Sequence, residues 1–230
     1  MNSGVQRLLV WVTPVAFVLI CIALIVPEWF PFPSPDHSAD YVGRYYRDHT
    51  DAIRLASVLL AAGAALLAPL AAVIAVHLRR IEGEFSPLAY LELGLGCASA
   101  LAISITSFFW WTAAFRPDRD PVVTQSWHDA GWLCLTAVVF IAMVQLGAIA
   151  VAILSDRSDP PLFPRWVAYL TAWVALLLLP SVMCLWFKTG PFAWNGIATL
   201  YLAFVAFGAW IITMMVQLLR VIREQESAAR

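Results

Sequence analysis

The sequence LASVLLAAGAALLAPLAAVIAV occupies residues 55–76 and contains no charged side chain and no histidine. At 1.5 Å per residue, a helix of this length crosses the ~30 Å hydrocarbon layer of a bilayer. A segment in lipid must satisfy its own backbone groups as a helix or join a closed barrel, and a continuous apolar run favours the helix. The stretch therefore predicts a transmembrane helix.

Five further runs lack Asp, Glu, Lys, Arg and His: residues 8–26, 93–115, 130–155, 166–187 and 197–219. The first is longer than the apolar core of a signal peptide and is followed by no small-residue cleavage site, so we expect it to be a helix of the final bundle. The sequence therefore predicts one all-α domain, residues 1–230, built as a polytopic membrane bundle of six transmembrane helices.

Composition excludes several classes of function. Hydrophobic residues make up 62% of the chain and charged residues 13%, about half the ~25% typical of a soluble domain. The net charge of −1 provides no basic face for nucleic acid. Membrane lipids are the expected surroundings, and no nucleic-acid partner is expected.

The positive charges of the loops favour one orientation. If the amino terminus is cytoplasmic, eight Arg lie inside and six Arg or Lys outside, a small excess in the direction of the positive-inside rule. The inside set is Arg7, Arg79, Arg80, Arg157, Arg165, Arg220, Arg223 and Arg230, and the outside set is Arg44, Arg47, Arg54, Arg116, Arg119 and Lys188. We therefore predict a cell (inner) membrane protein with both termini in the cytoplasm and long outer loops at 27–54 and 116–129.

Aromatic residues gather at the outer ends of the predicted helices. Seven of the eleven Trp lie there: Trp29, Trp110, Trp111, Trp127, Trp132, Trp186 and Trp194. An interfacial belt is one interpretation, because indole rings prefer that depth. A belt would enrich both faces equally, so the asymmetry also suggests an outward-facing vestibule or docking surface.

The outer loops also hold His37, His49 and His128 among several Asp residues. Such groups can bind a divalent metal, but their spacing matches no closed metal motif and neighbouring Arg can pair with the acids. We favour ion pairing and expect no metal and no cofactor. No His lies within a predicted span, so neither a bis-His haem nor a Ser–His–Asp site is expected there. Cys21, Cys97, Cys134 and Cys184 have no CxxC spacing and are interpreted as packing residues.

The third predicted helix carries one polar stripe. Glu92, Gly96, Ser99, Thr106 and Trp110 recur at helical intervals and so share a face. This face is a candidate cavity wall or helix contact, although Ser and Thr also bond their own preceding carbonyls. Gln145, in the middle of the fourth helix, is interpreted as an interhelical hydrogen-bonding residue or a ligand contact.

His77 and Glu92 lie at similar distances from the turn between the second and third helices. An imidazole beside a carboxylate suits proton transfer. Both residues are also within reach of Arg79 and Arg80, so we favour an ion-pair cluster at the cytoplasmic interface over a proton relay.

Five ordered segments carry a resemblance: residues 51–57 (DAIRLAS), 78–83 (LRRIEG), 115–121 (FRPDRDP), 164–166 (PRW) and 190–196 (GPFAWNG). They resemble a family of bacterial six-helix integral membrane proteins of uncharacterised function. The resemblance implies the same architecture over nearly the whole chain and brings no catalytic residues with it.

Two hypotheses for function remain, and enzymatic activity is left open. In the first, the protein binds or handles a lipophilic small molecule, such as a lipid, sterol or terpenoid, through an outward-facing vestibule lined by aromatic residues. The candidate ligand-binding residues are Arg54, Trp110, Trp111, Arg116, His128, Asp129, Trp132, Gln145 and Trp194. In the second, the protein is a non-catalytic subunit or scaffold whose outer loops dock a larger membrane complex.

Overall fold

The structure is a computed structural model that describes residues 3–228. This part of the chain is all-helical and contains no strand. In chain order the elements are α1 (Ser3–Ile25), α2 (Ala39–Asp48), α3 (Thr50–Ala65), α4 (Ala68–Glu82), α5 (Pro87–Phe115), α6 (Pro121–Ala137), α7 (Phe140–Ser155), α8 (Arg165–Leu177), the 3-10 helix η1 (Leu179–Leu185), the π-helical turn η2 (Ile197–Tyr201) and α9 (Leu202–Ala228).

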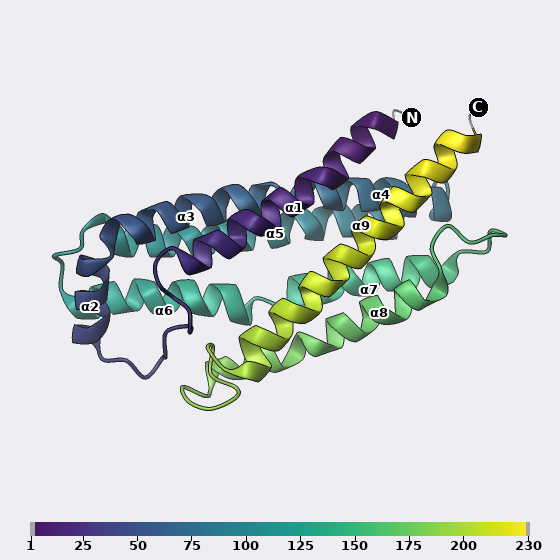
Figure 1. Ribbon diagram of the computed structural model, residues 1–230. Helices are drawn as coiled ribbons and strands as arrows, with labels where there is room; N and C mark the ends of the chain where they lie inside the picture. The colour runs from purple at the N-terminus through teal and green to yellow at the C-terminus, as the bar shows by residue number, and fades with distance from the viewer. Residues whose placement is uncertain (1–2, 229–230) are drawn as a thin grey trace.

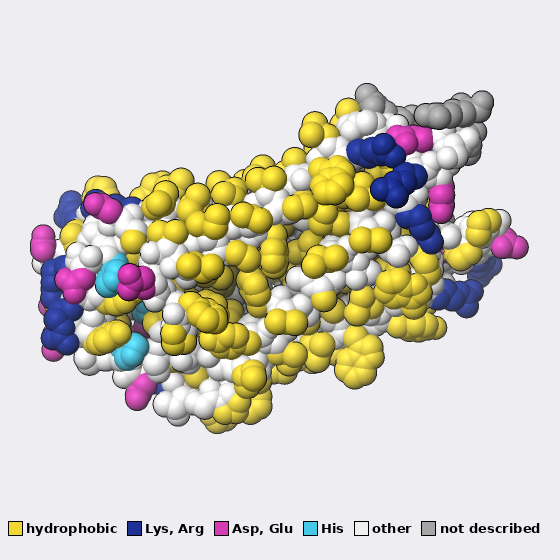
Figure 2. Space-filling view, viewed as in Figure 1, with side chains coloured by type: hydrophobic (Ala, Val, Ile, Leu, Met, Phe, Trp, Pro, Cys, Tyr) yellow, Lys and Arg dark blue, Asp and Glu magenta, His cyan; other side chains and the backbone are white. Residues whose placement is uncertain are grey.

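Six segments within residues 3–228 are long and apolar enough to cross a membrane, which confirms the predicted class of an all-α polytopic bundle. They are Ser3–Ile25, Thr50–Glu82, Pro87–Phe115, Pro121–Ser155, Arg165–Leu185 and Ile197–Ser227. Each overlaps one predicted span, and most of them extend beyond it. In Figure 2 hydrophobic side chains cover the middle of the bundle, while charged side chains gather at its two ends.

Successive spans are packed as neighbours, and the last closes onto the first. The α5 helix lies against α3 and α4 on one side and against α6 and α7 on the other, while α8 packs on α7 and α9. Helices α1 and α9 run side by side and antiparallel across the same face of the bundle (Figure 1). Arg7 and Glu226 join these two helices by an ion pair of 2.8 Å. The six spans therefore form a ring with a common interior.

Four of the spans are interrupted. The second breaks at Leu66 and Leu67, just before Pro69, whose ring removes one backbone donor. The fourth breaks at Val138 and Val139, the fifth tightens into η1 around Pro180, and the sixth begins with η2. Such departures from α-helical geometry are tolerated in a membrane where protein or a cavity surrounds them.

The two long outer loops predicted from the sequence are largely helical, which corrects that expectation. Within 27–54 the chain forms α2, whose first turn is capped because the Ser38 side chain accepts a hydrogen bond from the Tyr41 amide. Within 116–129 the chain starts α6, because Asp120 caps the Val122 amide at 2.8 Å and Pro121 stands in the first turn. The end of the bundle that the sequence predicts to face outward is therefore a helical cap rather than a set of open loops.

Both ends of the described chain lie at the same end of the bundle, opposite α2 (Figure 1). Arg230, one of the eight positive charges assigned to the cytoplasm, lies outside the described residues.

Candidate functional site

The outer tryptophans pack mainly against one another. The ring centroids of Trp29 and Trp110 lie 4.4 Å apart, those of Trp110 and Trp132 5.0 Å, and those of Trp29 and Trp132 5.4 Å. Each of these three side chains is at most 1% exposed. Trp194 stacks on Trp132 at 6.5 Å and donates its indole N–H to the Pro33 carbonyl at 2.8 Å. We call Trp29, Trp110, Trp132 and Trp194 the outer tryptophan cluster.

The outer tryptophan cluster is a small core and does not itself form the predicted vestibule. Trp29 belongs to the chain that follows α1, whereas Trp110 lies near the end of α5 and Trp132 lies on α6. Contacts among the three side chains therefore hold this chain against α5 and α6. The indole nitrogens of Trp29, Trp110 and Trp132 are buried without a hydrogen-bond partner, so the cluster is stabilised by apolar and ring-edge contacts. Trp111, the third predicted aromatic contact on α5 and α6, faces outward and is 43% exposed.

His128 links α6 to α2. Its Nδ1 lies 3.1 Å from the Tyr46 hydroxyl, and both side chains are buried. Burial, together with the nearby Tyr45 phenol and Asp129 carboxylate, raises the pKa of Tyr46 well above its usual value. The phenol therefore keeps its proton at neutral pH and can donate it to the imidazole.

An outer cavity of about 360 Å³ lies under the chain between α1 and α2 and is open to the bundle's outer end. Its wall includes Glu28, His37, Tyr41, Tyr45 and His128. The Tyr45 hydroxyl donates to the Pro27 carbonyl, and burial, with a contribution from Glu28, raises the pKa of Tyr45 to about 12. This cavity contains one of the nine predicted ligand-binding residues, His128.

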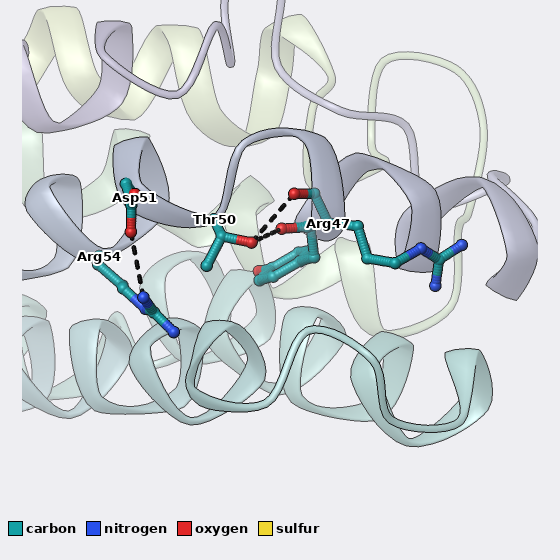
Figure 3. A network of polar contacts seen from close by, with 5 residues as sticks. Arg47, Thr50, Asp51 and Arg54 are labelled. Atoms are coloured by element: carbon teal, nitrogen blue, oxygen red, sulfur yellow. Dashed lines mark hydrogen bonds and ion pairs between the residues drawn. The ribbon is translucent and has the colours of Figure 1, made fainter.

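The predicted charged contacts lie elsewhere on the outer surface. Arg54 forms an exposed pair with Asp51 across one helical turn at 3.1 Å, beside the Thr50 hydroxyl that caps the end of α2 (Figure 3). Arg116 is exposed beyond the end of α5, and Asp129 is half-buried on α6. Neither arginine lines the outer cavity, so the structure does not bring Arg54 and Arg116 to His128.

A second cavity, of about 170 Å³, lies in the interior of the ring. We call it the central cavity, and all six spans contribute to its wall. The interrupted segments meet there: Val138 and Val139 between α6 and α7, Ser181 of η1, and Thr199 of η2. The interruptions of the last three spans therefore surround one space.

The wall of the central cavity is apolar with a few hydroxyl and thiol groups. The Ser181 hydroxyl donates to the Thr199 carbonyl at 2.7 Å, and Thr136 bonds its own helix and lies 3.4 Å from the Cys184 sulfur. The Thr199 hydroxyl is buried without a partner. A space of this kind suits an apolar molecule that carries few polar groups.

A third space, of about 180 Å³, lies between α1 and the start of α9, and we call it the lateral cavity. It shares Leu24 and Phe204 with the central cavity, so these two side chains form the partition between them. Phe30, Phe32 and Tyr201 line its outer side. Figure 1 shows α1 and α9 side by side on one face of the bundle.

A fourth space, of about 40 Å³, is lined by Glu92, Gly96 and Ser99 of the predicted polar stripe but not by its other two residues, and we call it the polar pocket. Gln145 of α7 donates to the Glu92 carboxylate at 3.2 Å and accepts from the Ser99 hydroxyl at 3.1 Å. Gly96 makes room for this contact, because a Cβ there would lie 3.0 Å from the Gln145 amide nitrogen and 2.4 Å from the Ala71 Cβ. The polar pocket and the central cavity share Ser99, Ile103 and Phe207.

The ion-pair cluster favoured from the sequence for Glu92 and His77 is not formed in the described part of the chain. Both side chains are fully buried, and among residues 3–228 the carboxylate of Glu92 forms no ion pair; its hydrogen-bonding partner is the Gln145 amide. His77 lies beside Phe163, with Nδ1 3.5 Å from an Arg80 nitrogen and Nε2 without a partner. Helix α4 turns His77 toward the interior of the bundle, and α5 does the same with Glu92. Arg79 and Arg80 are exposed at the end of α4.

Sequence reasoning missed the residues that form the central cavity. They are mostly small or aliphatic, such as Ala102, Ala142 and Ala203, and no pattern distinguishes an alanine facing a cavity from one facing a helix. Trp29 and Tyr46 were also missed as partners of His128, since their proximity depends on how α2 folds back. Among residues 3–228, no three His, Cys, Asp or Glu side chains meet as a potential metal site.

Comparison of the chain with protein-family models, with curated proteins and with solved structures finds no match.

Proposed function

We propose that this protein binds a lipophilic small molecule, such as a lipid, sterol or terpenoid, in the central cavity. The observation that carries the proposal is a mostly apolar space of about 170 Å³ that is lined by residues of all six spans. Protein interiors are normally packed with few voids larger than a water molecule. An apolar cavity of ~150 Å³ is enough to bind a benzene-sized molecule. The central cavity therefore has room for a ring or part of an alkyl chain.

The lateral cavity supplies the route by which the ligand enters the central cavity. Its position between α1 and α9 lets a molecule dissolved in the bilayer reach the bundle without crossing water, and only Leu24 and Phe204 separate it from the central cavity. We propose this route rather than the outward-facing vestibule as the entry, because the outer cavity shares no lining residue with the central cavity. The lateral cavity lies toward the α2 end of the bundle, which is the outer leaflet in the proposed orientation.

The proposed location is the cell inner membrane, with both termini in the cytoplasm. The excess of Arg at the end that carries both termini supports this orientation.

Lipid retention tests the proposal. The protein is purified in mild detergent, and bound lipids are extracted and quantified by mass spectrometry. Ala142→Phe places a ring in the central cavity, so retained lipophile should fall roughly tenfold or more, as expected when a ligand's volume is taken by a side chain. Ala172→Phe is the matched control, because Ala172 is exposed on α8.

The alternative function, a non-catalytic subunit of a larger membrane complex, gives the opposite result. A stoichiometric protein would then copurify, and no lipophile would be retained by the wild type. Equal retention in wild type and Ala142→Phe, with both variants folded by circular dichroism, would overturn the proposal.

A further inference from the structure

Glu92 is a buried carboxylate whose hydrogen bonding is incomplete. Its side chain is 0% exposed, Oε1 accepts from Gln145, and Oε2 has no partner. A carboxyl group in apolar surroundings requires either a proton or a cationic partner, because an isolated charge is costly there. No Lys, Arg or His lines the polar pocket. Because the pocket supplies no cation, Glu92 is completed either by a proton or by a donor group from outside the protein chain.

The pocket is arranged to receive one small polar group. Ser99 and Gln145 form a chain of hydrogen bonds that fixes the carboxylate, and Gly96 keeps the adjacent space open. The far wall is held by Trp210, whose indole donates to the Thr171 hydroxyl at 3.0 Å. A volume of about 40 Å³ accommodates about three or four groups the size of a water molecule, at roughly 10–15 Å³ each.

Three spaces follow one another along a single face of α9. Tyr201 and Phe204 line the lateral cavity, Phe204 and Phe207 the central cavity, and Phe207 and Ile211 the polar pocket. From Tyr201 to Ile211 the helix rises about 15 Å. One elongated molecule can therefore lie along α9 with its polar end beside Glu92 and its apolar body in the two larger cavities.

We propose that the polar pocket binds the polar end of a long-chain amphiphile whose terminus is a small hydrogen-bond donor, a primary ammonium or a hydroxyl group. This inference rests on the proposed function. The free Oε2 of Glu92 can accept a hydrogen bond from such a donor in place of its proton. An anionic terminus is excluded because no Lys, Arg or His lines the pocket to neutralise it, and a phosphodiester or sugar head group is excluded by the pocket's volume.

Four ten-carbon probes test this selectivity: decylamine, decanol, decanoic acid and decane. Each is titrated against the whole protein in lipid nanodiscs, and the apparent affinity is obtained from the rise of the thermal unfolding midpoint with probe concentration. Decylamine and decanol should bind roughly tenfold more tightly than decanoic acid, the effect of one hydrogen bond to a carboxylate. Subtracting the response of Ala142→Phe removes binding to the bilayer.

Glu92→Gln removes the ionisable carboxyl group while keeping its shape, so it should bring the affinities for decylamine and decanoic acid to within roughly twofold. Glu84→Gln is the matched control, because Glu84 is exposed in the turn between α4 and α5. If Glu92→Gln does not fold, Ser99→Ala, which frees the Gln145 amide oxygen, serves as a second variant and should weaken the preference in the same direction.

The outcomes separate the two proposals. If Ala142→Phe blocks all four probes but the wild type binds decanoic acid as well as decylamine, the assignment of the polar pocket is wrong and the proposed function stands. The same conclusion follows if Glu92→Gln keeps the wild-type preference. If no probe binds the wild type better than Ala142→Phe, both proposals fall.

Discussion

Gly131→Ala tests whether the outer tryptophans form a packed core or an open ligand cage. A Cβ at Gly131 would lie 2.2 Å from the Trp110 indole nitrogen and 2.4 Å from its Cδ1, against the 3.4 Å at which ordinary contact begins. The Trp110 ring would have to move by more than 1 Å. It is 1% exposed and is surrounded by Trp29 and Trp132, so no free volume exists to receive it.

The expected cost follows from this geometry. Overpacking a core typically costs 1–3 kcal/mol, and we expect about 3 kcal/mol here because the obstructing atoms belong to a rigid, enclosed ring. For a chain of this size each kcal/mol lowers the unfolding midpoint by ~2–4 °C. Gly131→Ala should therefore lower the midpoint by roughly 6–12 °C in nanodiscs, measured by tryptophan fluorescence.

Gly147→Ala is the matched control. The same methyl group is added to a membrane helix, but a Cβ at Gly147 meets nothing within 4 Å. Because Ala is a better helix former than Gly by about 1 kcal/mol, this variant should be as stable as the wild type or more stable. If Gly131→Ala were as stable as Gly147→Ala, the outer tryptophans would have free space around them and the packed-core interpretation would be refuted.

Two further changes probe individual hydrogen bonds. Trp210→Phe removes the indole donor to Thr171 and should lower stability by about 1 kcal/mol, as for other interhelical bonds in membranes; an unchanged midpoint would show that the bond contributes nothing. Asp156→Asn removes the negative charge of a carboxylate that accepts hydrogen bonds from Ser158 and from the Leu162 amide. Burial of Asp156 raises the pKa of its carboxyl group, but the hydrogen bonds have the larger combined effect and lower that pKa from 3.8. A lowered pKa gives stability that is present above pH 3.8 and is lost as the pH falls through the folded-state pKa. The free energy of unfolding of the wild type should therefore be about 1 kcal/mol higher than that of Asp156→Asn at pH 7, and this difference should disappear in acid. A difference that did not vary with pH would contradict this assignment.

The positions of the spans could be predicted because charge is excluded from lipid, and runs such as 55–76 mark that exclusion directly. The amphipathic α2 and the start of α6 were missed for the same reason, since both carry charged residues. Their signals were local: Ser38 and Asp120 stand at the cap positions, and Pro121 follows. The break before Pro69 has a visible cause in the sequence.

The remainder of the candidate site depends on tertiary packing. The break at Val138 and Val139 involves no Pro or Gly, so it is set by the neighbouring spans rather than by a local signal. The shared face of Glu92, Gly96 and Ser99 follows from helical periodicity, but whether it meets an arginine or the Gln145 amide depends on how α5 and α7 pack. The central cavity has no signature in the sequence, because its wall consists mostly of ordinary apolar residues from six separate spans.

Photo-crosslinking tests the central claim most directly. A decyl chain that carries a photoreactive group is bound to the protein in nanodiscs, irradiated, and located by mass spectrometry of the peptides. If the central cavity holds the ligand, label should appear on Ala142 and on Ala203 or Phe207, and Ala142→Phe should suppress the labelling of α9. Label confined to lipid-facing positions such as Leu101 and Phe108, with no change in Ala142→Phe, would contradict the account.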